Sequence, residues 1–287
     1  MISTPGVATA AECIGRSAPT AMLAAMAELT SVAVYRRRIG ASLERVWENV
    51  RDWEHLPWLH RDSFASIDLE HEDERGWRAR VGLRAPANAV VRLELAASDD
   101  RRYVARTLEG PGADTEIWTR LDPIDAHRTG IEVEFLVPDM AAGRRDALGA
   151  AYVALYTRLW DQDEAMMQRR SFLLDAPRAP RAARTPVDLG PAAELEARLP
   201  LRVSFAGRPV VVARCDGELL AYDALCPHAL GPLDAAPLSE DGRVVCPWHG
   251  KAFDVHTGRD CEAVSRLRLF LAPRVEVAGG RVRLVTA

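Results

Sequence analysis

The stretch that decides the fold is Cys226-Pro227-His228, followed by seventeen residues and then by Cys246-Pro247-Trp248-His249. Two thiolates and two imidazoles are the ligand set of a [2Fe-2S] cluster in which cysteine holds one iron and histidine the other. A mononuclear zinc site also accepts two cysteines and two histidines, but zinc-finger spacing keeps like ligands together, whereas each loop here mixes them. The stretch therefore predicts a [2Fe-2S] cluster, with four ligands: Cys226, His228, Cys246 and His249.

The residues after His249 extend this pattern. They read Gly250-Lys251-Ala252-Phe253-Asp254, and Thr257-Gly258 follows. With these residues the segment resembles the Rieske family over about residues 186–287. The resemblance implies an all-β Rieske domain at the C-terminal end of the chain.

Two departures from the family pattern concern the surroundings of the cluster. Rieske proteins of respiratory complexes carry an extra cysteine in each loop, where this chain has Gly231-Pro232 and Trp248. They also place serine and tyrosine hydroxyls near the cluster, where Lys251 and Phe253 stand here. Fewer hydrogen bonds to the cluster lower its reduction potential. The segment therefore resembles the low-potential domains of Rieske ferredoxins and Rieske oxygenases.

The amino-acid composition is that of an ordinary protein, and a length of 287 residues leaves room for two domains. A net charge of −4 gives no indication of the positively charged surface that binds nucleic acid. Apolar runs are too short for a membrane span, and no basic region precedes the apolar residues of the N-terminus, so neither a span nor a secretory signal is expected. The three cysteines outside the motif are scattered, which fits a reducing cytoplasm: Cys13, Cys215 and Cys261.

Upstream of the Rieske segment, residues 31–175 carry the pattern of a second domain. A strand is expected over residues 31–40, then a helix from Leu43 capped by Ser42, and a short helix over residues 53–56 that Pro57 ends. Segments with period-two alternation then predict an antiparallel meander, and the stripe of three- and four-residue spacings over about residues 140–174 predicts a long helix.

This order of elements resembles the helix-grip fold of START-like and polyketide-cyclase-like proteins. The residues that open the segment, Val46-Trp47 through Asp52-Trp53-Glu54 and Leu56-Pro57, look like the usual opening of that family. The resemblance implies a curved antiparallel sheet around a long C-terminal helix, with an apolar cavity between them. The chain as a whole is expected to be α+β, with a flexible arm over residues 1–30, the helix-grip domain over 31–175, a proline-interrupted linker over 176–185 and the Rieske domain over 186–287.

A second group of chemical residues lies inside the first domain, in Asp52-Trp53-Glu54-His55-Leu56-Pro57-Trp58-Leu59-His60. This acidic residue and two histidines resemble a motif of Rieske non-haem iron oxygenases. The resemblance implies that His55 and His60 bind a mononuclear Fe(II), and that Asp52 links this iron to a cluster histidine of a neighbouring subunit. Gln162-Asp163 resembles the acidic pair on the last helix of that family, which nominates Asp163 as the third ligand.

Simple geometry bears on this assignment. Residues five apart on a regular helix point about 140° from each other, so His55 and His60 need a distortion, which Pro57 supplies. Asp163 lies on the stripe that faces the sheet, where an unpaired carboxylate is costly. The competing interpretation makes both histidines surface residues at a helix end and pairs Asp163 with one of two arginines, Arg158 or Arg170.

The order of the two domains is the reverse of that in the oxygenases that the chain resembles. We expect the cluster of one chain to meet the iron of its neighbour, because the linker then need not bring together the two sites of one chain. Such an arrangement requires a homo-oligomer, and a trimer is expected from the resemblance.

The first functional hypothesis is a Rieske-type oxygenase that hydroxylates, dihydroxylates or oxidatively demethylates a small apolar or aromatic molecule with dioxygen. A separate reductase or ferredoxin would donate the electrons, because the chain has no glycine-rich dinucleotide motif. The alternative is a domain that binds a hydrophobic ligand without metal, fused to a ferredoxin-like electron-transfer domain. A third hypothesis makes His55 or His60 the general base of a cyclase or hydrolase. Five aromatic residues suggest a flat ligand: Trp58, Trp118, Tyr152, Tyr156 and Trp160.

Overall fold

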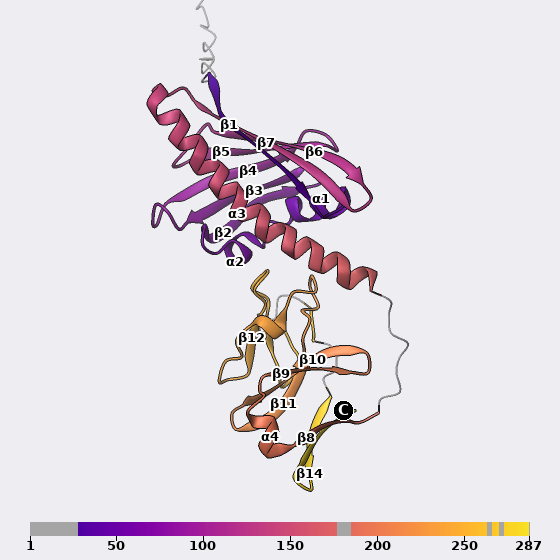
Figure 1. Ribbon diagram of the computed structural model, residues 1–287. Helices are drawn as coiled ribbons and strands as arrows, with labels where there is room; N and C mark the ends of the chain where they lie inside the picture. Colours follow the sequence, from indigo (N-terminus) through magenta and orange to yellow (C-terminus); the bar gives the residue numbers. More distant parts are fainter. Residues whose placement is uncertain (1–27, 177–184, 263–265, 270–272, 287) are drawn as a thin grey trace, which may run out of the picture.

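The computed structural model describes residues 28–176, 185–262, 266–269 and 273–286. Two domains follow each other along the chain (Figure 1). The first consists of one large sheet with three helices, and the second is built mainly of short strands. The α+β class and this order of domains agree with the prediction. Residues 1–27 of the expected N-terminal arm and most of the expected linker lie outside the described residues, whereas the last two residues assigned to the arm, 29 and 30, belong to the first strand.

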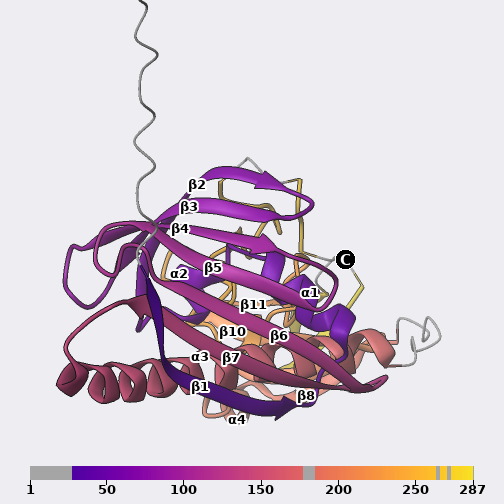
Figure 2. The same ribbon diagram turned by 90° about the horizontal axis from the view of Figure 1, so that it is seen from above.

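The first domain is organised by a seven-stranded antiparallel sheet in the order β1-β7-β6-β5-β4-β3-β2. The sheet is a meander whose last strand returns to pair with its first, and Figure 2 shows its strands side by side. Its strands are β1 (Leu29–Ile39), β2 (Phe64–Asp73), β3 (Gly76–Leu83), β4 (Val90–Ala97), β5 (Arg102–Glu109), β6 (Glu116–Asp125) and β7 (Arg128–Pro138).

Alternation along the strands decides which side chains enter the core. Ala79 and Val81 of β3 and Val133 of β7 are fully buried, because every second residue points to the same face. On the opposite face Arg78 pairs with Glu94, its partner in the β3–β4 register. The sheet thus has one apolar and one charged face, as the alternation predicts.

Three helices accompany the sheet. Helix α1 (Leu43–Arg51) begins after Ser42, whose Oγ accepts a hydrogen bond from the backbone N–H of Arg45 at 3.2 Å. Helix α2 (Leu56–Leu59) starts where the sequence pattern predicted a helix to end. Pro57 lies in its first turn, where the missing N–H leaves no hydrogen bond unmade, so the proline opens this helix instead of breaking one.

Helix α3 (Ala142–Asp175) crosses the apolar face of the sheet and makes the helix-grip arrangement (Figure 1). Tyr152 stacks on Phe135 of β7 at a centroid distance of 5.0 Å, and Tyr156 meets the same ring edge-on at 4.8 Å. Trp160 and Met167, farther along the helix, are buried in the same core. The residues of α3 that follow continue toward the second domain.

The second domain contains three small antiparallel sheets, in the orders β11-β10-β9, β12-β13 and β14-β15-β8. Its elements are β8 (Val187–Pro191), α4 (Ala192–Glu196), β9 (Leu201–Phe205), β10 (Arg208–Cys215), β11 (Glu218–Asp223), η1 (Leu233–Ala235), β12 (Arg243–Val245), β13 (Ala252–Asp254), β14 (Arg274–Ala278) and β15 (Arg281–Val285). Among the helices in the described ranges, none is both long and apolar enough to cross a membrane.

Candidate metal centres

Two loops of the second domain present the predicted cluster ligands, and both fold in the same way. In the first, the backbone N–H of Cys226 donates to the carbonyl of Gly231, and that of Leu230 donates to the carbonyl of Cys226. In the second, Cys246 and Gly250 repeat these bonds, at 2.9 Å each. Leu230 and Gly250, each four residues after its cysteine, adopt positive φ angles of 64° and 67°. The two ligand loops therefore share one backbone conformation.

The four side chains meet in a small space. The Cys226 and Cys246 thiols are buried, and their mutual hydrogen bond raises the pKa of Cys226 and lowers that of Cys246 to about 5. The rings of His228 and His249 cross edge to face with centroids 4.6 Å apart. The Nδ1 atom of His249 is buried and has no hydrogen-bond partner in the structure. Two adjacent thiols facing two adjacent imidazoles, one with an orphaned ring nitrogen, fit a [2Fe-2S] cluster.

Gly231 closes one wall of this space. A Cβ atom there would lie 2.5 Å from the Cys246 Sγ and 3.2 Å from the ring of Trp248, both in the opposite loop. The place of a cysteine in respiratory Rieske proteins is therefore taken here by Trp248. At position 231, which faces Trp248, there is room only for the hydrogen atom of a glycine.

We expect Gly231→Ala to lower both the cluster content and the stability of the protein, the latter by about 1–3 kcal/mol, because the added methyl overpacks the ligand loops. Visible absorbance per chain and denaturant unfolding measure the two effects. Gly143→Ala is the matched control, since a Cβ there meets nothing within 4 Å and alanine favours the helix. Full cluster content in Gly231→Ala would contradict this account of the wall.

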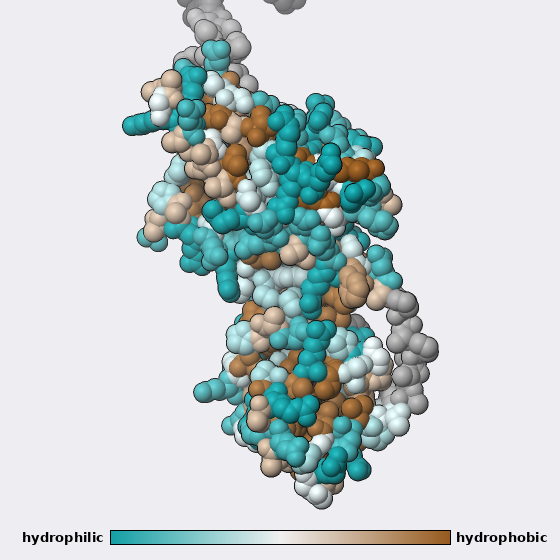
Figure 3. All heavy atoms as spheres, in the orientation of Figure 1, coloured by the Kyte–Doolittle hydropathy of each residue, from teal (hydrophilic) through white to brown (hydrophobic). Residues whose placement is uncertain are grey.

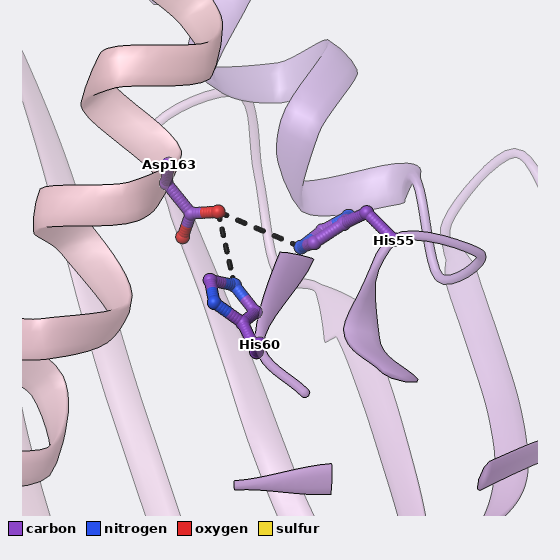
Figure 4. A group of neighbouring side chains, drawn as sticks. All are labelled: His55, His60 and Asp163. Carbon is purple, nitrogen blue, oxygen red and sulfur yellow. Dashed lines mark ion pairs between the residues drawn. The ribbon is translucent and has the colours of Figure 1, made fainter. Parts of the chain in front are cut away.

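The second centre lies under the sheet of the first domain and is formed by His55, His60 and Asp163. The histidines flank α2 at its N-cap and C-cap, and Asp163 points at both from α3 (Figure 4). Asp163 Oδ1 lies 3.0 Å from His60 Nε2 and 3.6 Å from His55 Nε2. All three residues are buried, and their ligand atoms lie within 4.8 Å of one another. The short helix is the distortion that lets residues five apart in sequence face one point.

A hydrogen bond to the second ring nitrogen of His60, Nδ1, fixes the orientation of this ring toward Asp163. The Gln162 side-chain oxygen lies 2.7 Å from His60 Nδ1, so Nδ1 carries a proton. Burial lowers the pKa of His60, but Asp163, whose Oδ1 lies next to Nε2, raises it above the usual value, so a proton between these two atoms is favoured without metal. A divalent metal would take the place of this proton, and two imidazoles with one carboxylate are the facial ligand set of mononuclear Fe(II). The residues therefore fit such an ion.

We expect Gln162→Leu to weaken metal binding at this centre about 10- to 100-fold, because His60 loses the acceptor that orients its ring and fixes its tautomer. Equilibrium dialysis of Fe(II) against the metal-depleted protein measures the affinity. Gln168→Leu, on the same helix but bonded to Glu164, is the control. An unchanged affinity in Gln162→Leu would show that the amide does not position His60.

Asp52 connects the two centres. Its Oδ2 accepts a hydrogen bond of 2.6 Å from His249 Nε2 and lies 3.8 Å from His55 Nδ1. Burial alone would raise the pKa of Asp52, but the contacts with His249 and His55 hold it well below the usual carboxyl range. Burial would likewise lower the pKa of His249, which Asp52 and Cys246 raise to about 9. The bond to an ionised Asp52 holds a proton on His249 Nε2, so Nδ1 is the ring nitrogen that could bind the cluster after losing its own proton.

The structure thus brings all eight predicted site residues together in one chain. This differs from the expectation that a cluster would meet only the iron site of a neighbouring subunit. The arginines considered as alternative partners of Asp163 lie elsewhere, since Arg170 contacts Glu48 and Arg158 donates to the carbonyl of Ala154. His55 and His60 are buried, with exposed fractions of 5% and 2%, so they are not surface residues.

The aromatic residues suggested as a ligand surface are more dispersed than the pattern indicated. Trp118 lies on the charged face of the sheet, where its Nε1 donates to Glu116 at 2.7 Å. Trp160 belongs to the core, and Trp58 packs against Gly250 of the second domain. Tyr152 and Tyr156 pack on Phe135 of the sheet. The role of Gln162 and the contact made by Trp58 were missed, because neither tautomers nor domain contacts leave a periodic signal.

Comparison with known proteins identifies the second domain. The model of the Rieske [2Fe-2S] domain matches residues 185–268. The ferredoxin component of the p-cumate 2,3-dioxygenase system from Pseudomonas putida is 35% identical over 88 residues, which cover 29% of this chain and 70% of that protein. Chloroplastic pheophorbide a oxygenase from Arabidopsis thaliana is 31% identical over 94 residues, which cover 32% of this chain and only 16% of that protein.

The first domain also has similar solved structures. The Zhui aromatase/cyclase from Streptomyces sp. R1128 superposes with a TM-score of 0.45 and 15% sequence identity, covering 52% of this chain and 100% of that one.

Proposed function

The chain belongs to the Rieske [2Fe-2S] family, and from this premise we propose that it is a Rieske-type non-haem iron oxygenase. In this proposal Cys226, His228, Cys246 and His249 hold the cluster, and His55, His60 and Asp163 hold a mononuclear Fe(II). When bound, the cluster would supply single electrons and the iron would supply open positions for dioxygen. The substrate would be a small apolar or aromatic molecule, and the reaction hydroxylation, dihydroxylation or oxidative demethylation.

The observation that carries the proposal is the position of Asp52. One carboxylate contacts His249 of one ligand set and His55 of the other, through 2.6 Å and 3.8 Å. An ionised Asp52 next to the C-terminal end of α1 is unfavourable by itself, because the helix dipole is negative there. The two histidines offset this cost. An acidic residue also stands at this point in helix-grip proteins without metal, so it is the shared contact with His249 and His55 that favours the oxygenase.

The two cluster imidazoles have different surroundings, which assigns them different tasks in this proposal. The His249 side chain is 1% exposed and is covered by Asp52, whereas that of His228 is 31% exposed. A donor reductase or ferredoxin would approach His228, and His249 would face the oxygenase site. Burial raises the pKa of Tyr103 and of Tyr156 above the usual range, so both hydroxyls stay neutral near Asp163.

The second candidate is a ferredoxin-like electron carrier fused to a domain that binds a hydrophobic ligand. It is favoured by the match to a ferredoxin component over 70% of that protein's length. The two candidates differ in one consequence. In an oxygenase, dioxygen reoxidises the reduced cluster through a reaction that needs the His55–His60–Asp163 centre. In a carrier, removal of metal from that centre leaves reoxidation unchanged.

The test is therefore the rate at which dioxygen reoxidises the reduced cluster, followed by visible absorbance in a stopped-flow instrument. The protein is reduced anaerobically, freed of reductant and mixed with oxygen in the presence of a panel of small aromatic compounds. The proposal predicts fast reoxidation that slows after mild chelation of the mononuclear metal and returns when Fe(II) is added. Equal rates before and after chelation would favour the carrier.

The surroundings of the cluster also predict its potential. Phe253 is fully buried where Rieske proteins of respiratory complexes place a hydroxyl, and the Lys251 amine is directed to Glu54. The carboxylates of Asp52 and Glu54 lie beside the cluster histidines and stabilise the oxidised state, which is the more positive one. We expect a midpoint near about −150 mV, the low end of the Rieske range, in a dye-mediated redox titration. A midpoint above about +100 mV would contradict this description.

A further inference from the structure

The structure shows more contacts between the domains than the Asp52–His249 bond. Lys251 Nζ donates to Glu54 Oε1 at 3.0 Å, and Glu54 Oε2 lies 3.9 Å from His228 Nε2. Asp52 and Glu54 are two residues apart, as are His249 and Lys251. The Asp52–His249 and Glu54–Lys251 bonds therefore follow each other in the same order along residues 52–54 and residues 249–251.

A contact between Trp58 and Gly250 lies beside these two bonds. Gly250, between His249 and Lys251, has a φ of +67°, and a Cβ atom there would overlap the indole of Trp58. Trp58 stands between the two iron-ligand histidines of the first domain. The loop that carries one centre therefore packs directly on the loop that carries the other, with a glycine at the point of closest approach.

Apolar and charged contacts surround this point. Leu59 and Met166 of the first domain pack against the core of the second, and Arg169 lies 3.5 Å from Asp234. In the space-filling view the molecule narrows where the two domains meet, and hydrophilic and hydrophobic residues are mixed on this face (Figure 3). Apolar packing brings the domains together, but it is non-directional and does not select one register of His249 against Asp52.

We propose that the cluster domain serves the His55–His60–Asp163 centre of its own chain, and that the Lys251–Glu54 ion pair is the positioning contact that sets the register. The proposal rests on the proposed function for its use, but the contact itself does not. Both side chains are partly buried, at 18% and 32% exposure, so the pair is less screened than a fully exposed pair. Lys251 is also the only lysine of the sequence, which uses arginine at every other basic position.

In this arrangement no neighbouring subunit is needed to bring the cluster next to the iron site. With the cluster and the iron site joined inside one chain, each subunit holds a complete electron path from the exposed His228 to His55. The expected trimer stays a prediction, but electron delivery within this chain does not depend on it.

The single lysine makes the test specific. A water-soluble carbodiimide activates carboxyl groups and joins one to an amine only at contact distance, with loss of water. The intact protein with its cluster is treated after natural chains and heavy-nitrogen-labelled chains have been mixed and equilibrated. Trypsin then releases residues 52–61 joined to residues 244–259, and fragmentation in the mass spectrometer locates the amide.

The proposal predicts an amide between Lys251 and Glu54 in which both peptides carry the same isotope label, and its absence in Glu54→Gln. Peptides of mixed label would show that the cluster domain docks on a neighbouring chain, and absence of the amide would show that the ion pair does not form. Either result overturns the proposal. This readout does not depend on iron in the first domain, so its failure is separate from failure of the oxygenase proposal.

A second experiment tests the positioning role. In Lys251→Gln the rate of cluster reoxidation by dioxygen should fall roughly fivefold, the upper range for an ion pair of this exposure. Lys251→Arg should restore the rate, because it keeps the charge. The cluster spectrum should stay unchanged in both, and the thermal midpoint of Lys251→Gln should fall by no more than about 4 °C. A rate that does not fall, or that arginine fails to restore, would remove Lys251 from the positioning role.

Discussion

Asp163→Ala is expected to abolish oxygen-dependent turnover while the visible spectrum of the cluster stays intact. Asp163 Oδ1 is the atom that faces both His55 and His60, and it is the only carboxylate among the three described residues that could hold this metal. Two imidazoles alone hold Fe(II) poorly, since the facial ligand set is incomplete. Iron content should fall from about three to about two per chain, with unchanged acid-labile sulfide.

The neighbouring acid on the same helix provides the control for this substitution. Asp161 is 60% exposed and pairs with Arg37 on the outer side of α3. Asp161→Ala should keep all iron and full turnover. Full turnover in Asp163→Ala would remove the carboxylate from the scheme and would favour the carrier function.

Asp52→Asn is expected to slow cluster reoxidation by dioxygen roughly a hundredfold, although both centres keep their metal. The amide has nearly the same shape as the carboxylate, but it lacks the charge that holds the proton on His249 Nε2 and faces His55 Nδ1. The connection between the two ligand sets is then weakened without loss of a ligand. Stopped-flow absorbance measures the rate, and iron analysis shows that neither centre is empty.

Asp62→Asn is the control for this change, because Asp62 lies just past His60 and is exposed. It should leave the rate unaltered. If Asp52→Asn also reoxidised at the rate of the unaltered protein, electrons would have to reach His55 by another route.

The sequence was most informative where one short segment carries a complete chemical pattern. Each cluster loop holds one cysteine and one histidine within four residues, so the ligand set could be proposed without knowledge of the fold. Strands with strict alternation, such as the one around Val81 and the one around Val133, were also placed well, because burial of one sheet face imposes the period.

Other features depend on contacts that no local pattern encodes. Pro57 is compatible with both the end and the first turn of a helix, and only the packing of α2 between the sheet and the second domain decides between them. The Trp58–Gly250 contact depends on how two separately folded domains fit together. The same holds for Asp52 and His249, which are 197 residues apart, so the meeting of the two centres inside one chain was not predicted.

The measurement that tests the account most directly is the ratio of iron to acid-labile sulfide in protein purified anaerobically, combined with spectra of the reduced form. The account predicts about three irons and two sulfides per chain, of which one iron is lost in His60→Ala while the cluster signal is retained. About two irons and two sulfides, unchanged by His60→Ala and by added Fe(II), would contradict it. The first domain would then hold a ligand without metal, and the chain would be an electron carrier.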